Sequence, residues 1–107
     1  MRRYGQIIQL KPEYEGIYKE LHRNPWPEVN EVIKECNISN YSIFLKDNLL
    51  FAYFEYEGMD FEGDMRRMGE SEITKLWWEK TDPCQIPISS AGENEWWVNM
   101  EVVYHLD

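Results

Sequence analysis

Residue types that mark several common kinds of site are scarce in this sequence. It has two cysteines and two histidines, and neither cysteine lies in a Cys-x-x-Cys motif. Cys36 and Cys84 therefore predict no zinc site, and we interpret Cys36 as a small apolar residue of a helix face. No stretch approaches the roughly 20 apolar residues of a membrane span. The apolar run behind Arg2 and Arg3 is too short for a signal peptide, so we expect a cytoplasmic protein with reduced thiols.

Basic residues are also scarce, which limits the macromolecular partners. Lysine and arginine number 11 against 20 aspartates and glutamates, and the formal net charge is −9. Apart from the pairs Arg2-Arg3 and Arg66-Arg67, no basic cluster is present. An acidic surface repels phosphate backbones and anionic lipids. We therefore expect neither nucleic acid nor a membrane as a partner.

Aromatic residues, in contrast, are abundant for a chain of 107 residues. They make up 15% of it, with five tryptophans and seven tyrosines. A core this small needs fewer, so we expect some of them to line a ligand site or an interface. The length is typical of one domain, and no repeat or boundary divides residues 1–107.

The order of the hydrophobic patterns predicts the fold class. We expect strands at 4–10, 41–45, 49–57 and 96–106, helices at 12–22, 27–36, 61–68 and 70–80, a turn at 37–40 and a long loop at 82–95. This order is the β-α-β-β-α-β ferredoxin-like pattern with each helical layer doubled. It predicts an α+β fold in which all helices cover one face of an antiparallel sheet.

The opposite face of that sheet predicts a partner subunit. The middle of the expected strand 49–57 is apolar on both faces, from Leu50 to Phe54, which is typical of a strand covered on both sides. Large apolar patches are rarely left exposed. We therefore expect a homodimer whose sheet faces pack together into a dimeric α+β barrel.

Tyr18 and His22 are the first candidates for chemistry. They are four residues apart on a predicted helix, so they are neighbours on one face. Histidine is the side chain whose ordinary pKa suits proton transfer near neutral pH. A lone histidine at a helix end is, however, more often a capping or surface residue.

Two pairs of tryptophans are further candidates for ligand contact. Trp77 fits the core stripe of its helix, whereas Trp78 points about 100° away and could present a flat ring to the C–H face of a sugar. The pair could equally serve as core and dimer contact. For Trp96 and Trp97 we favour packing.

Tyr41 and Glu101 are less specific. The Tyr41 hydroxyl could reach a sugar, but a core or interface role is as natural for it. Glu101 is expected on the covered face of the sheet, where a carboxylate needs a partner. A polar site and a dimer salt bridge explain it equally well.

At these residues the sequence resembles the L-rhamnose mutarotase family, along nearly the whole chain. The resemblance rests on six anchors in order: Tyr18-Lys-Glu-Leu-His22, Asn24-Pro25-Trp26-Pro27-Glu28, Asn40-Tyr41-Ser-Ile, Asn48-Leu-Leu-Phe51, Trp77-Trp78 and Glu101-Val-Val-Tyr104. The chain departs from the family's pattern at three places: the loop Pro83–Pro87, the pair Trp96-Trp97 and the acidic stretch Asp60–Glu72. These departures bear on the exact sugar more than on the reaction.

The resemblance implies a homodimeric enzyme that interconverts the α and β anomers of L-rhamnose by acid/base ring opening and closure, without cofactor or metal. It implies His22 as the proton donor, with Tyr18, Tyr41, Trp77 and Trp78 holding the sugar. The base stays open between an ordered water, Tyr18 and Glu101. Three alternatives also stay open: another deoxysugar such as L-fucose, a cofactor-free oxygenase by fold analogy alone, and a non-catalytic sugar-binding module.

Overall fold

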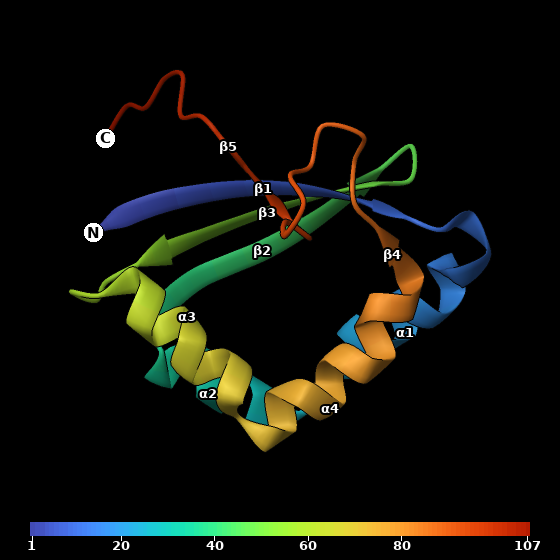
Figure 1. The fold of residues 1–107 in the computed structure, drawn as a ribbon, viewed down its shortest axis with the longest axis horizontal. Coiled ribbons are helices and arrows are strands. Elements are labelled where there is room, and N and C mark those ends of the chain that lie inside the picture. The colour runs from blue at the N-terminus through green and yellow to red at the C-terminus, as the bar shows by residue number, and fades with distance from the viewer.

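The computed structural model describes all 107 residues. One antiparallel sheet lies on one side and the four helices lie on the other (Figure 1). The strands follow the order β2-β3-β1-β4, and β5 also pairs with β1. The elements are β1 (Arg2–Leu10), η1 (Pro12–Tyr14), α1 (Glu15–Arg23), α2 (Pro27–Glu35), β2 (Ile38–Lys46), β3 (Leu49–Tyr56), α3 (Phe61–Glu70), α4 (Glu72–Thr81), η2 (Asp82–Cys84), β4 (Gln85–Ile86) and β5 (Val98–Met100). The predicted ferredoxin-like α+β class is confirmed.

The core lies between the sheet and the helices. Every second residue of β3 is buried, from Leu50 to Tyr56, as expected for a strand with one face against the core. Ile8 and Leu10 of β1 join Leu50 and Tyr18 in one buried cluster. Tyr18, the buried residue of α1, therefore has its ring in the core. Its hydroxyl group lies at the edge of that core.

Two prolines determine where the helices begin. Pro12 opens η1 and Pro27 opens α2, because the fixed φ of proline suits the first helical turn. Asn24 and Trp26 each precede a proline and adopt non-helical backbone angles. The predicted interruption between α1 and α2 is thus confirmed, and it leaves His22 in the last turn of α1.

The β2–β3 hairpin follows the prediction at its turn but not at its start. Asp47 and Asn48 have φ of 52° and 62°, values that suit a tight hairpin turn. The turn expected at 37–40 is present at Asn37, but its extension to residue 40 is wrong, because β2 already begins at Ile38. Asn40 has φ of 49° and lies in a register shift between Ser39 and Ser42. This irregularity, which resembles a β-bulge, includes Tyr41.

The C-terminal region differs most from expectation. Only Val98–Met100 of the predicted strand 96–106 pairs with β1, and residues 101–107 are exposed without regular structure. The alternation of apolar and polar residues shows which side chains would share a face if the segment were extended. A stable strand also needs the free edge of another strand to pair with. The predicted loop 82–95 is in turn partly ordered, because Gln85 pairs with Leu10 at the end of β1.

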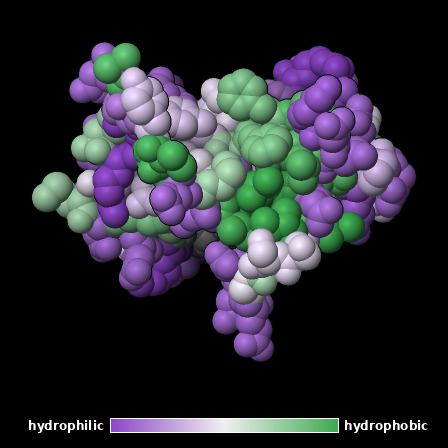
Figure 2. Space-filling view, turned by 90° about the horizontal axis from the view of Figure 1, so that it is seen from above, coloured by the Kyte–Doolittle hydropathy of each residue, from purple (hydrophilic) through white to green (hydrophobic).

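The face of the sheet away from the helices is open. Register places Phe44 beside Phe51, Phe51 beside Ile7 and Ile7 beside Val98, and Phe44 is 63% exposed. Figure 2 shows this side, where an apolar area over the sheet is bordered by hydrophilic side chains. None of the four helices is long and apolar enough to cross a bilayer.

Candidate functional site

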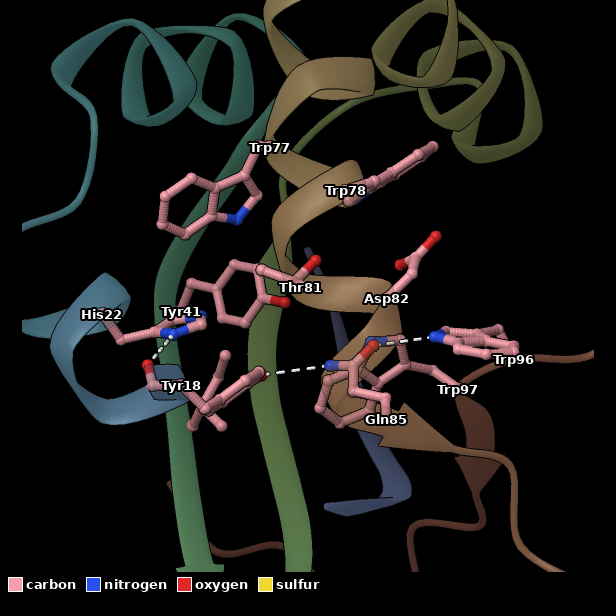
Figure 3. Close-up of a pocket in the computed structure, with 11 residues that line it drawn as sticks. Tyr18, His22, Tyr41, Trp77, Trp78, Thr81, Asp82, Gln85, Trp96 and Trp97 are labelled. Atoms are coloured by element: carbon pink, nitrogen blue, oxygen red, sulfur yellow. Dashed lines mark hydrogen bonds between the residues drawn. The ribbon is translucent and has the colours of Figure 1, made fainter. Parts of the chain in front are cut away.

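A cavity of about 390 Å³ lies where α1, α4 and β2 meet the segment that follows α4. This volume lies within the roughly 300–1,000 Å³ of small-molecule sites. Figure 3 shows the lining side chains, which are Tyr18, His22, Tyr41, Ile43, Trp77, Trp78, Thr81, Asp82, Gln85, Trp96 and Trp97. All five residues predicted to act on or hold a sugar line this one cavity. Their roles stay predictions.

A second cavity adjoins the first on the side of α2. It measures about 440 Å³ and shares His22, Tyr41, Ile43 and Trp77 with the first cavity. Its remaining lining comes from Pro25, from Val29 to Lys34 of α2 and from the first residues of β2. Tyr18, Trp78 and Asp82 belong to the first cavity only, and the aromatic side chains converge there.

His22 is held in one orientation by Tyr18. Its Nδ1 lies 2.8 Å from the backbone carbonyl oxygen of Tyr18, and the two rings stack with centroids 4.2 Å apart. A carbonyl oxygen can only accept, so Nδ1 carries the hydrogen and donates it. In the neutral imidazole the lone pair is therefore on Nε2, which has no hydrogen-bond partner in the protein.

The surroundings of His22 favour its neutral form. Burial lowers the pKa of the imidazole below its ordinary value of 6.5, and the hydrogen bond to the Tyr18 carbonyl opposes this only in part. The ring also meets the edge of Trp77, with centroids 5.4 Å apart. At neutral pH the site therefore presents a base at Nε2.

The adjacent tryptophans of α4 have different environments. Trp77 is 8% exposed, whereas Trp78 is 41% exposed. Trp77 packs edge-on against both His22 and Trp26, so it belongs to the core and to the cavity wall at once. Trp78, the next residue of α4, points to a different side of the helix (Figure 3) and also lines the cavity.

Two tyrosine hydroxyls reach the cavity. Desolvation raises the pKa of Tyr41 to about 12. Burial likewise raises the pKa of Tyr18 above its ordinary value, although the hydrogen bond from Gln85 lowers it in part. Both phenols are therefore protonated at neutral pH, so Tyr18 is unsuited to the role of base that the sequence left open.

Asp82, Thr81 and Gln85 are lining residues that sequence reasoning missed. They lie at the end of α4 and in the segment predicted to be loop, where no periodic pattern marks them. Asp82 is the one acidic side chain of the lining; it is exposed, and partial desolvation raises the pKa of its carboxyl. Gln85 is buried and bonds to both Tyr18 and Trp96.

Of the remaining candidates, Trp96 and Trp97 line the cavity and Glu101 lies on the surface. Trp97 packs against the core cluster, as favoured from the sequence, and also lines the cavity. Trp96 is 40% exposed and donates a hydrogen bond into the site, so packing alone does not describe it. Glu101 is exposed and lies outside the lining; the expected covered face is wrong because β5 ends at Met100.

Possible metal ligands do not converge anywhere in the chain. No group of three His, Cys, Asp or Glu side chains is placed to hold an ion. Cys36 and Cys84 are both buried free thiols, and burial raises the pKa of each. These environments are those of core residues rather than of reactive thiols.

Comparisons with known proteins identify the family of this chain. The model of the L-rhamnose mutarotase family matches residues 3–106. An L-rhamnose mutarotase of Bacteroides thetaiotaomicron is 30% identical over 115 residues and covers all of both chains. One of Listeria monocytogenes is 34% identical over 108 residues and covers 99% of both.

Solved structures share the fold. The crystal structure of an L-rhamnose mutarotase from Formosa agariphila superposes with a TM-score of 0.78 at 24% identity and covers both chains fully. A type-II polyketide cyclase, tetracenomycin F2 cyclase from Streptomyces glaucescens, has a TM-score of 0.74 at 13% identity, covering 100% of this chain and 98% of that one. The same architecture thus carries unrelated chemistry, and function must be argued from the site.

Proposed function

Because this chain belongs to the L-rhamnose mutarotase family, we propose that it interconverts the α and β anomers of L-rhamnose. The observation that carries the proposal is the position of His22. Its imidazole is neutral, has a free Nε2 and lies in a cavity lined by four indoles and two phenols. Ring opening needs one proton removed and one delivered, and this nitrogen can do both.

The first half of the reaction opens the ring. Nε2 of His22 takes the proton of the anomeric hydroxyl while the bond between the anomeric carbon and the ring oxygen breaks. The electron pair of that bond leaves with the ring oxygen, and the anomeric carbon becomes an aldehyde. The imidazolium of His22 then gives its proton to the ring oxygen. Since both oxygens are attached to the same carbon, one nitrogen can serve both.

The second half reverses these steps on the other face. After rotation about the bond next to the aldehyde, Nε2 takes the proton back from the former ring oxygen, which attacks the carbonyl carbon. The new anomeric oxygen receives that proton. His22 therefore is the predicted proton donor in each half, and it is also the base that the sequence left unnamed. A positioned group of this kind typically contributes about 10²–10⁴-fold.

The other lining residues hold the sugar and stabilise charge. The indoles of Trp77 and Trp78 offer flat apolar surfaces to the C–H face of a pyranose. The hydroxyl of Tyr18 stays neutral and can donate a hydrogen bond to the oxygen that carries negative charge as the ring opens. The carboxylate of Asp82 can accept hydrogen bonds from sugar hydroxyls. Tyr41 contributes a second neutral donor.

The proposal is tested by anomer exchange in solution. Saturation of one anomeric proton signal of L-rhamnose transfers to the other signal when exchange is fast, so nuclear magnetic resonance measures the catalysed rate directly. We expect the protein to accelerate exchange of L-rhamnose more than that of L-fucose. Faster exchange of L-fucose would support the other deoxysugar. Binding with no exchange would support the non-catalytic module and contradict the enzyme.

The protein is further proposed to act as a homodimer. The row Phe44, Phe51, Ile7 and Val98 crosses the open face of the sheet in register, and a second copy presents the same apolar row in a twofold arrangement. Burial of apolar surface contributes roughly 25 cal/mol per Å², so covering this face stabilises an assembly. The cytoplasmic location expected from the sequence likewise stays a proposal.

A further inference from the structure

The side chain of Gln85 links two residues of the cavity wall. Its Nε2 donates a hydrogen bond of 3.1 Å to the hydroxyl oxygen of Tyr18. Its Oε1 accepts one of 2.7 Å from Nε1 of Trp96. Figure 3 shows both bonds, which run in one line from the indole through the amide to the phenol. Gln85 is 4% exposed, so water does not compete for these contacts.

The backbone around Gln85 is fixed on both sides. Gln85 pairs with Leu10 at the end of β1, and the amide of Lys11 donates to the carbonyl of Cys84 at 2.8 Å. On the other side, Nε2 of Gln9 donates to the carbonyl of Pro87. The short strand β4 therefore holds the amide side chain in place from the sheet, independently of any ligand.

The chemistry of the three groups determines the direction of the hydrogen bonds. An indole N–H can only donate, so the amide must turn its oxygen toward Trp96. The NH₂ group then faces Tyr18, whose hydroxyl oxygen accepts. The hydrogen of the Tyr18 hydroxyl is consequently free of Gln85. It has no acceptor elsewhere in the protein, and it lies at a cavity that His22 also lines.

We propose that Gln85, oriented by Trp96, is a positioning residue that makes the Tyr18 hydroxyl a hydrogen-bond donor toward the bound sugar. This inference rests on the proposed function. It assigns a role to two segments in which the chain departs from the family's sequence pattern, the loop Pro83–Pro87 and the pair Trp96-Trp97. Without this orientation the Tyr18 hydroxyl could accept a hydrogen bond as readily as donate one. In part of the molecules its oxygen lone pair would then face the sugar oxygen that becomes negatively charged.

The substitution Gln85→Glu reverses the polarity with nearly the same shape. An introduced carboxylate accepts from both neighbours, so Tyr18 donates to it and no longer to the sugar. We expect kcat to fall about tenfold at mildly alkaline pH, equivalent to roughly 1.4 kcal/mol, with little change in KM. When the introduced carboxyl is protonated it can again donate to Tyr18 and accept from Trp96. The ratio of variant to wild-type kcat should therefore rise as pH falls.

Gln6→Glu is the matched control. Gln6 lies on β1, outside the cavity, and its side chain bonds to Asn99. The same chemical change there should leave the exchange rate and its pH profile as in the wild type. A Gln85→Glu ratio that is independent of pH, or a kcat equal to that of the wild type, would overturn the positioning role.

A readout without sugar separates this inference from the proposed function. The indole N–H signal of Trp96 is assigned in a nitrogen-15 correlation spectrum by its loss in Trp96→Phe. Gln85→Leu should shift that signal, because it removes the acceptor, and an unshifted signal would contradict the link itself. If the wild type exchanges no sugar, the proposed function fails while this spectrum still tests the link. Trp96→Phe keeps an aromatic ring, removes the indole N–H that orients Gln85 and should lower kcat severalfold. This second variant tests the proposal if Gln85→Glu fails to fold.

Discussion

The imidazole of His22 donates from Nδ1 to the carbonyl oxygen of Tyr18, one turn earlier in α1, across 2.8 Å. This single contact decides which ring nitrogen faces the ligand space, because the carbonyl cannot donate. Together with the burial that lowers the pKa of His22, it makes the resting side chain a base. The acid form arises only after a proton has been taken from the sugar.

The pH dependence of the catalysed exchange follows from this. Because the pKa of His22 lies below 6.5, Nε2 stays available at neutral pH, and the rate should be level there. It should decline as pH falls through the lowered pKa, with a midpoint below 6.5, once the spontaneous rate has been subtracted. A midpoint above 6.5 would contradict a buried neutral imidazole.

The same series needs a check on folding. The unfolded chain binds a proton at His22 more readily than the folded chain, so acidification from 6.5 down to the lowered pKa favours unfolding. Circular dichroism at each pH separates this loss from the loss of the base. The prediction applies to conditions in which the folded signal is unchanged.

Trp77 and Trp78 should respond differently to truncation. Trp77→Ala removes a buried ring and should lower the free energy of unfolding by about 3–5 kcal/mol, measured by urea denaturation. Trp78 is 41% exposed, so Trp78→Ala should cost much less stability while raising KM for the sugar. An unchanged KM in Trp78→Ala would show that Trp78 does not hold the ligand.

Asp82→Asn tests whether the carboxylate binds or catalyses. A neutral amide accepts a weaker hydrogen bond than a carboxylate, so KM should rise about tenfold, roughly 1.4 kcal/mol, while kcat stays within a small factor. Asp47→Asn in the hairpin turn is the matched control and should change neither constant. A large fall in kcat with KM unchanged would instead make Asp82 the base and remove that role from His22.

Phe44→Glu tests the homodimer. Phe44 lies at the β2 end of the apolar row on the open sheet face and is 63% exposed. Burying an unpaired carboxylate at this position against a second copy is costly. Light scattering during size-exclusion chromatography should give a dimer for the wild type and a monomer for the variant. Ile17→Glu, an exposed position on α1, should remain dimeric. A monomeric wild type would end the proposal.

The fold was largely predictable from the sequence because its elements have strong local signals. Pro12 and Pro27 mark helix starts, and the Asp47-Asn48 turn sets the hairpin register. The spacing of Tyr18 and His22 likewise predicted neighbours that do stack. These features depend on interactions between residues close together in the chain, so a short stretch of sequence is enough to predict them.

The parts that were missed depend on contacts between distant segments. Gln85 acquires its place from pairing with Leu10 and from Trp96, and nothing in the segment 82–95 alone indicates either partner. Residues 101–106 alternate like a strand, but no edge of this chain pairs with them. Asp82 carries no periodic signal; its position directly after the helix that presents Trp77 and Trp78 could have indicated it.

The central claim is that His22 performs both proton transfers, and saturation-transfer spectroscopy of L-rhamnose tests it most directly. The wild type should exchange the two anomers rapidly, and His22→Ala should lose about 10²–10⁴-fold of the catalysed rate while its circular dichroism stays that of a folded protein. His105→Ala, which removes the other histidine in the exposed C-terminal segment, should exchange like the wild type. Exchange in His22→Ala equal to that of the wild type would contradict the account.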